Sequence, residues 1–202
     1  MDIDKIDLKV FAAPAADGIG FEVGRLIPVF HRWIQQGRLE ELAVDVADYS
    51  HVPGGPGVIL VCHDAQYSVG GAGGGLGLLY SRRRETHPAL AALDSLDERL
   101  ESVFLRALDA CTKLQIEGSL GGALRFPCDR FVLWINDRRV GTEAGDDLAA
   151  ALFAIFGRLL PQTEVEVGTA LDAGRLRADV SVAGQPGATV LAQKLRMGVT
   201  VQ

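Results

Sequence analysis

Two short apolar runs, each preceded by a glycine-rich cluster, strongly limit what this chain can fold into. They are Val58–Val61 and Leu76–Tyr80, within the stretch 51–85 (HVPGGPGVILVCHDAQYSVGGAGGGLGLLYSRRRE). A continuous apolar run of this kind is typical of a strand with both faces covered. The clusters Pro53–Gly57 and Gly70–Gly75 predict turns in front of these runs. Since short connections join successive antiparallel strands, this stretch predicts an antiparallel meander.

Strand and helix patterns follow on both sides of this stretch. Further strands are predicted at Leu8–Ala12, Leu42–Tyr49, Leu124–Phe126 with Phe131–Ile135, Thr163–Val167, Arg177–Val182 and, in the tail, Ala188–Val201. Apolar residues at helical spacing predict three main helices, from Phe21 to Gly37, from His87 to Glu117 and from Glu143 to Leu160. The sequence therefore predicts an α+β fold with an antiparallel-rich mixed sheet and three main helices.

The longest predicted helix carries an apolar stripe with alternate spacings of three and four. The stripe consists of Leu93, Leu96, Leu100, Val103, Ala107, Ala110 and Leu114. One interpretation is a core helix lying across the sheet. The alternative is that part of the stripe packs on a second copy, because heptad spacing suits helix pairing. Ala107 and Ala110 weaken this alternative, since they offer little apolar area to bury.

The chain is long enough for one globular domain over residues 1–202. Gly118–Gly122 is the best candidate linker, so lobes 1–86 and 119–202, joined by the long helix 87–117, are the alternative arrangement. The order strand, helix, strand, strand occurs in 8–62 and again in 124–182. This order suggests two β-α-β-β halves.

Charge and cysteine content exclude several classes of protein. The formal net charge of −6 argues against a general nucleic-acid or anionic-membrane binder, which needs a cationic surface. No uncharged apolar run approaches the roughly 20 residues that span a bilayer, and the charged N-terminal residues lack the apolar core of a signal peptide. Cys62, Cys111 and Cys128 are odd in number and far apart, which indicates free thiols in a reducing cytoplasm.

Two motifs resemble reactive sites, but their context favours structural roles. Cys62, His63 and Asp64 are the chemical parts of a cysteine nucleophile system. Neighbours on a strand point to opposite faces, however, so His63 cannot easily reach both of the others. The glycines of Gly70–Gly75 lead into an apolar strand and lack the lysine of a phosphate-binding loop, so we interpret them as a hairpin connection.

The run Arg82, Arg83 and Arg84 is the strongest functional candidate. Arginine binds carboxylates and phosphates through a planar fork of donors, and ligands collect at strand ends in α/β proteins. His63 could transfer protons nearby, and Tyr67 could line the same pocket. The alternative is a solvated charge run, or ion pairs with the acidic long helix. The histidines have no metal-ligand spacing, and we expect no metal and no cofactor.

Three stretches, HVPGGPGVILVCHDAQYS, GLLYSRR and WINDRR, resemble a group of uncharacterised bacterial proteins of about this length, for which no activity is assigned. The resemblance covers most of the chain. It implies that the following belong to a shared pattern: the Pro-Gly turn, His63, Tyr67, Arg82, Arg83 and the turn Asn136-Asp137-Arg138. It implies no cofactor and no reaction.

Two hypotheses on function follow. The first is a non-catalytic interaction or assembly module, forming a homo-oligomer through the long helix or an exposed strand edge. The second is an enzyme or binding protein for a small anionic metabolite, which uses the arginine run and His63. We expect no nucleic-acid or membrane partner, and the sequence does not identify a protein partner.

Overall fold

The computed structural model describes residues 5–13, 21–83, 93, 95–136 and 144–199. The strands are β1 (Ile6–Phe11), β2 (Ala43–Tyr49), β3 (Gly57–Cys62), β4 (Ala65–Gly70), β5 (Gly77–Arg82), β6 (Arg130–Ile135), β7 (Val165–Asp172) and β8 (Arg175–Val182). The helices are α1 (Leu26–Gln36), α3 (Leu96–Gln115), α4 (Ala144–Leu159) and α5 (Ala188–Val199), with short 3-10 turns η1 (Val23–Arg25) and η2 (Gly118–Leu120). Three positions from the sequence analysis lie outside the described residues: the expected first residues of two helices, His87 and Glu143, and Arg84.

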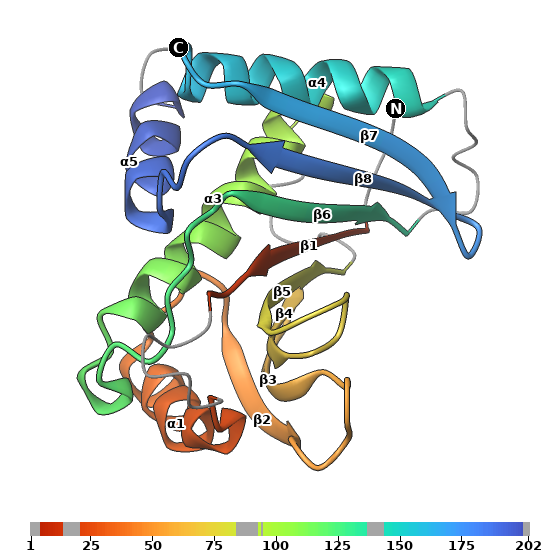
Figure 1. The fold of residues 1–202 in the computed structure, drawn as a ribbon. Coiled ribbons are helices and arrows are strands. Elements are labelled where there is room, and N and C mark those ends of the chain that lie inside the picture. Colours follow the sequence, from red (N-terminus) through yellow and green to blue (C-terminus); the bar gives the residue numbers. More distant parts are fainter. Residues whose placement is uncertain (1–4, 14–20, 84–92, 94, 137–143, 200–202) are drawn as a thin grey trace.

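All eight strands form one sheet, in the order β2-β3-β4-β5-β1-β6-β8-β7, and every described pair is antiparallel. The α+β fold with an antiparallel sheet, predicted from the sequence, is therefore confirmed. β1 lies near the middle and pairs with β5 on one side and with β6 on the other (Figure 1). Strands from both ends of the chain thus belong to the same sheet.

The two halves of the chain share their strand order apart from one inserted hairpin. The order strand, helix, strand, strand is found as β1-α1-β2-β3 and again as β6-α4-β7-β8. In both halves the second strand lies at a sheet edge and the third lies inside it. The hairpin β4–β5 is inserted between β3 and β1, and no hairpin corresponds to it among the described residues of the second half. The central strands β1 and β6 are antiparallel, so the halves run in opposite directions.

The helices pack on one face of the sheet. α1 contacts β2 and β3, α3 contacts β1 and β5, and α4 contacts β7 and β8, while α5 packs on α3 (Figure 1). Alternate strand residues such as Ile6, Leu8 and Val10 are fully buried beneath the helices in the main core. A separate small cluster of Phe11, Val132 and Trp134 lies on the other side of the sheet. We call that side the open face.

The long helix α3 is a core helix, as the first interpretation predicted. It begins with a capping box, in which the Ser95 hydroxyl accepts from the Glu98 backbone N–H and the Glu98 carboxylate accepts from the Ser95 N–H. The stripe residues Leu100, Val103, Ala107, Ala110 and Leu114 are all buried. Ala107 and Ala110 are both fully buried within the monomer. None of the described helices is both long enough and apolar enough to cross a membrane.

Three segments differ from the expectation. Leu124–Phe126, predicted as a strand, forms only an isolated β-bridge between Arg125 and Ala13. Residues 188–199 form helix α5, where a strand was predicted, because Ala188, Leu191 and Leu195 recur at helical spacing and bury one side of the segment. The prediction of a strand in this tail was therefore wrong. Residues Ala65–Gly70 form β4, which was not predicted, although Ala65, Tyr67 and Val69 alternate with Gln66 and Ser68 as in a strand.

Three phenylalanines hold α3 and α4 against the sheet. Phe104 on α3 meets Phe131 on β6 and Phe156 on α4 edge to face, with ring centroids 5.5 and 5.3 Å away. All three side chains are at most 1% exposed. Aromatic pairs of this geometry stabilise a core beyond the area that they bury.

We expect Phe104→Ala to lower the free energy of unfolding by about 3–5 kcal/mol, because it removes both ring contacts and leaves a cavity. Phe153→Ala is the matched control: Phe153 lies on α4 but is 45% exposed, so its loss is expected to change stability by less than about 0.5 kcal/mol. Urea unfolding followed by circular dichroism measures both. Similar losses in the two variants would contradict the central role of this ring cluster.

Candidate functional site

Arg82, the first arginine of the predicted anion site, points into the protein. Its side chain lies on the helix side of β5, and the residue is 4% exposed. Its guanidinium donates to the Ser102 hydroxyl at 2.7 Å and to the Arg99 carbonyl at 3.5 Å, both on α3. Arg82 therefore ties the end of β5 to the long helix.

Tyr67 also points into the helix side, where its ring packs at a tilt against that of its cross-strand partner, Tyr80. The rings of Tyr67 and Tyr80 lie 4.9 Å apart, and both are 1% exposed. The Tyr80 hydroxyl donates to the Glu41 carboxylate at 3.1 Å. Burial, with further contributions from Tyr80 and Glu41, raises the pKa of Tyr67 well above its usual value. Both phenols stay protonated at neutral pH, so this pair forms a structural polar cluster.

His63 lies at the end of β3 on the outside of the protein. Its side chain is 65% exposed, and its Nδ1 lies 3.0 Å from the Asp64 carboxylate. The neighbouring Cys62 is 2% exposed and belongs to the main core. Burial, followed by the charges of Glu41 and Asp64, raises the pKa of the Cys62 thiol to about 12. A thiol with this pKa is a poor nucleophile at neutral pH.

Arg83 points outward and donates to the Gln66 side-chain oxygen at 2.7 Å. The five predicted ligand residues are therefore divided. Tyr67 and Arg82 lie inside, His63 and Arg83 lie outside, and Arg84 is beyond the described residues. They do not converge on one pocket in the described part of the chain.

Because Arg82 is buried and Arg83 lies on the surface, replacing each of them should affect the free energy of unfolding differently. We expect Arg82→Met to lower the free energy of unfolding by about 2 kcal/mol, because hydrogen bonds from a charged group are lost in a buried setting. Arg83→Met, the matched control, is expected to cost less than about 0.5 kcal/mol. Thermal and urea unfolding measure the difference. An unchanged stability of Arg82→Met would contradict the structural role.

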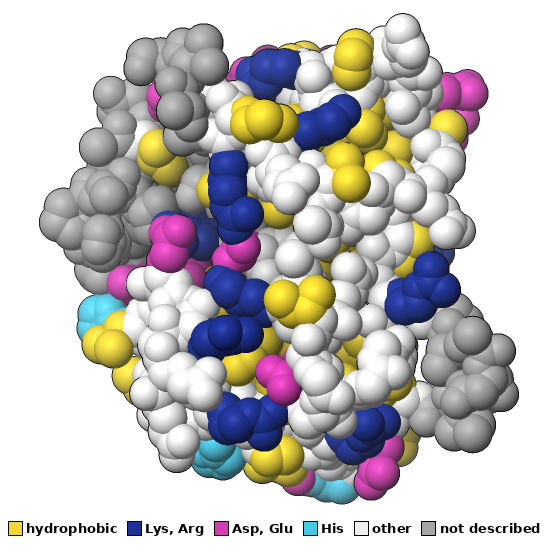
Figure 2. Space-filling view, turned by 90° about the vertical axis from the view of Figure 1, so that its left-hand side faces the viewer, with side chains coloured by type: hydrophobic (Ala, Val, Ile, Leu, Met, Phe, Trp, Pro, Cys, Tyr) yellow, Lys and Arg dark blue, Asp and Glu magenta, His cyan; other side chains and the backbone are white. Residues whose placement is uncertain are grey.

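The helix-covered side carries many cations, most of which are neutralised. Figure 2 shows Lys and Arg side chains following one another from top to bottom across this side, with acidic side chains among them. The ion pairs are Arg32–Glu117, Arg106–Glu40, Arg158–Glu101, Arg196–Asp109 and Lys113–Asp109. A row of paired cations attracts phosphate weakly, because each charge already has a counterion within the protein.

The open face carries aromatic and cationic side chains on its central strands. Phe11 and Trp134 are 7% and 6% exposed, because arginine side chains and a loop lie over them. The Arg130 guanidinium lies 3.7 Å from the centroid of the Phe11 ring, and those of Arg175 and Arg177 lie 5.7 and 5.8 Å from that of Trp134. These are cation–π distances. The aromatic cluster is thus closed against water from above.

The glycine loop between β4 and β5 folds over the same face and is held by Lys9. The Lys9 ammonium donates to the Gly70 carbonyl at 2.9 Å and to the Gly77 carbonyl at 3.1 Å, at the two ends of the loop. At Gly73, with φ +81°, a Cβ atom would lie 3.1 Å from the Trp134 ring. A side chain there would be strained and crowded, so glycine permits this close approach.

Lys9 is fully buried, and it forms no ion pair with any described residue. Burial lowers the pKa of Lys9 from 10.5 to about 8, and a small opposite effect of the Cys111 thiol does not offset this. A neutral lysine is a nucleophile, but this amine is closed off from solvent by the loop. Its geometry therefore fits a clamp for the loop rather than a reactive group.

Polar groups link four strands, β1, β6, β7 and β8, at one end of the open face. The Trp134 indole N–H donates to the Asp172 carboxylate at 3.0 Å, and the Asn136 amide donates to the Asp7 carboxylate at 2.6 Å. Arg175 donates to the Asn136 side-chain oxygen at 3.2 Å. Arg175 and Arg177 are accordingly tied to neighbouring acids and amides, whereas Arg130 packs on the Phe11 ring.

The buried lysine gives the protein a specific pH dependence. Between pH 8 and 10.5 the native Lys9 binds fewer protons than the unfolded one, so the free energy of unfolding rises with pH in this window. We expect the free energy of unfolding of wild type, relative to that of Lys9→Met, to rise by about 3 kcal/mol across this pH window. Urea unfolding at pH 7.5 and pH 10 measures this. A constant difference would show that Lys9 has an ordinary pKa.

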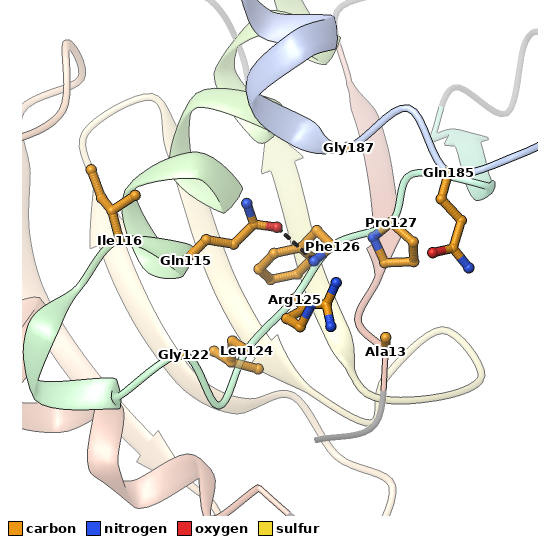
Figure 3. A pocket seen from close by; sticks show the side chains of 10 residues that line it. All are labelled: Ala13, Gln115, Ile116, Gly122, Leu124, Arg125, Phe126, Pro127, Gln185 and Gly187. Carbon is orange, nitrogen blue, oxygen red and sulfur yellow. Dashed lines mark hydrogen bonds between the residues drawn. The ribbon is translucent and has the colours of Figure 1, made fainter. Parts of the chain in front are cut away.

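One pocket of about 570 Å³ lies away from all these residues, between the end of α3, the segment before β6 and the turn before α5. Figure 3 shows Leu124, Arg125, Phe126 and Pro127 in sequence along one extended segment of this pocket. The Phe126 N–H donates to the Gln115 side-chain oxygen at 2.7 Å. Among the described residues, no cluster of three or more His, Cys, Asp or Glu side chains is arranged to hold a metal ion.

Sequence reasoning missed Lys9, Trp134 as a member of the open face, and Arg125. A signal existed for Lys9: a lysine in the middle of a predicted apolar strand needs an explanation. For Arg125, the neighbouring Leu124 and Phe126 are apolar, so strand alternation turns the arginine away from the core. The pocket itself depends on distant segments and gave no sequence signal.

No protein-family model, no curated protein and no solved structure matches this chain.

Proposed function

We propose that this chain is a non-catalytic assembly module, whose copies pair edge to edge through β7. The difference between the two edges of the sheet carries this proposal: β2 is protected against pairing, whereas β7 is regular and uncharged along its middle. Of the two routes considered from the sequence, the long helix is the less favourable, because its apolar stripe is already buried within the monomer.

The β2 edge carries several features that oppose pairing with another strand. Its register shifts between Ala43 and Asp45, which is the mark of a β-bulge. The Asp45 carboxylate accepts the Val46 backbone N–H at 2.8 Å, so this donor is already satisfied within the strand. Asp45 and Asp48 would also bring negative charge to a shared edge. Bulges and charges of this kind protect edge strands.

The β7 edge has no bulge, and its charged residues lie near its ends. All eight of its residues pair with β8 in continuous register. Its charged residues, Glu166 and Asp172, lie near the ends, and residues 167–171 between them are uncharged and free of proline. Leu171 is 51% exposed, and Phe153 on the adjacent helix α4 is 45% exposed. An exposed regular edge with apolar residues beside it favours strand addition.

A second copy suits this edge because two identical strands can pair antiparallel about a two-fold axis. Residues directly opposite each other in such a pair point to the same face of the sheet, so the residue at the axis lies opposite its own copy. With the axis at Gly168, Glu166 lies opposite Ala170 of the second copy. With the axis at Thr169, Glu166 would lie opposite Asp172, and like charges directly opposite are destabilising. Charge thus disfavours the Thr169 register, and with Gly168 at the axis the sheet continues from one copy into the next.

The binding of a small anion at the arginine run and His63 is the second candidate, and it has less support. The groups that it needs are divided between the interior and the surface. A cytoplasmic location is supported by three buried free cysteines, Cys62, Cys111 and Cys128. The net charge of −6 and the paired cations argue against a nucleic-acid partner.

Gly168→Lys tests the β7 edge with little risk to the fold. No atom lies within 4 Å of a Cβ placed at Gly168, and its cross-strand neighbour is Asp179, which a lysine complements. Two lysines at the two-fold axis would repel each other. We expect light scattering to give twice the chain mass of 21.5 kDa for wild type and the single mass for Gly168→Lys.

Val44→Lys is the matched control, since it places the same charge on the other edge strand, at a side chain that is 55% exposed. It is expected to leave the dimer intact. A monomeric wild type, or a dimer that survives Gly168→Lys, would contradict pairing through β7. A dimer lost only in Val44→Lys would assign the interface to β2 instead.

A further inference from the structure

The pocket between α3 and α5 has a rigid frame, because its central segment is fixed by hydrogen bonds to three different elements. The Arg125 carbonyl accepts from the Ala13 N–H at 2.8 Å, and the Pro127 carbonyl accepts from the Gly187 N–H at 2.9 Å. The Phe126 N–H is bound by Gln115 on α3. A pocket framed in this way exists before any ligand binds.

The described part of the lining carries one charge. Its described residues are Ala13, Gln115, Ile116, Gly122, Leu124, Arg125, Phe126, Pro127, Gln185 and Gly187. Arg125 is exposed, and its guanidinium makes no hydrogen bond or ion pair with any part of the described chain. None of the described lining residues is acidic. The pocket therefore complements a single negative charge.

The rest of the lining is apolar or amide. Leu124, Phe126 and Pro127 contribute apolar walls, and Ile116 at the rim is 69% exposed. Gln115 and Gln185 add amide groups that can donate hydrogen bonds. The volume of about 570 Å³ lies within the range of roughly 300–1,000 Å³ that is usual for small-molecule sites. The pocket lies between the end of α3 and the start of α5, whose partial charges have opposite signs and oppose each other. Arg125 therefore sets the preference of the pocket for a negatively charged ligand.

We propose that this pocket binds a small monocarboxylate with an apolar body, whose carboxylate is held by Arg125. A planar guanidinium binds a carboxylate through two parallel hydrogen bonds. One cation neutralises one carboxylate, whereas a phosphate dianion would leave negative charge uncompensated in this lining. The site is independent of the proposed dimer, because none of the described lining residues belongs to β7.

Octanoate is the probe, and octylamine and octanol share its chain length but not its charge. Backbone amide shifts of the full chain are followed by nuclear magnetic resonance, with ligand up to about 10 mM, which saturates a site with a Kd of about 1 mM. We expect octanoate to move the amides of Gly122, Phe126 and Gly187 in a saturable way. Octylamine and octanol are expected to bind roughly tenfold more weakly or not at all.

Variants separate the role of Arg125 from general effects of charge. Arg125→Gln is expected to weaken octanoate binding about tenfold or more. Gln185→Glu keeps the size of the side chain but adds a repelling charge, so it should weaken binding, and Gln185→Lys should strengthen it. Arg38→Gln is the matched control, because it removes an exposed positive charge on a residue that does not line the pocket.

Three results would overturn the proposal. They are an absence of saturable shifts at the pocket amides, equal binding of octylamine and octanoate, and unchanged octanoate affinity in Arg125→Gln. The amide spectrum of each variant also reports whether it is folded. Arg125 contributes only its main chain to the hydrogen bonds of the frame, so Arg125→Gln is expected to keep the fold and to test recognition alone.

Discussion

The pairing of β1 on both of its sides is the constraint on which the rest of the structure depends. β1 joins a meander of four strands, β2 to β5, to a group of three, β6 to β8. Its residues Ile6, Leu8 and Val10 lie under α3, which also contacts α4 and α5. Without β1 the two groups of strands would have no hydrogen bonds between them. The continuity of the sheet and of the core thus depends on one strand of six residues.

All four described helices lie on one side of the sheet, so the apolar residues of the open face need another cover. Side chains of the sheet itself and one loop provide it. Arginines lie over Phe11 and Trp134, and the glycine loop is held down by Lys9. Burying a charged amine costs free energy, as its lowered pKa reflects. The gain is a covered face, which leaves the edges and the α3–α5 pocket as the accessible places for recognition.

Much of the architecture could be predicted because it depends on local pattern. The apolar runs at Val58–Val61 and Phe131–Ile135 and the stripe of α3 each carry a clear period. The candidate site could not be predicted in the same way, because it depends on distant contacts. The two acceptors of Lys9 lie 61 and 68 residues along the chain. Arg82 belongs to an exposed-looking run, yet strand alternation turns it towards α3.

The central position of β1 also has a consequence for the time course of synthesis. β1 pairs Ile6 with Ile135 of β6, so one of its two neighbours is made long after it. At roughly 5–20 residues per second, a ribosome needs about 6–26 s to extend the chain from one to the other. During that time the meander from β1 to β5 has an unsatisfied edge in the middle of the future sheet. A nascent chain with this topology is therefore exposed to wrong partners longer than one whose central strands are neighbours in sequence.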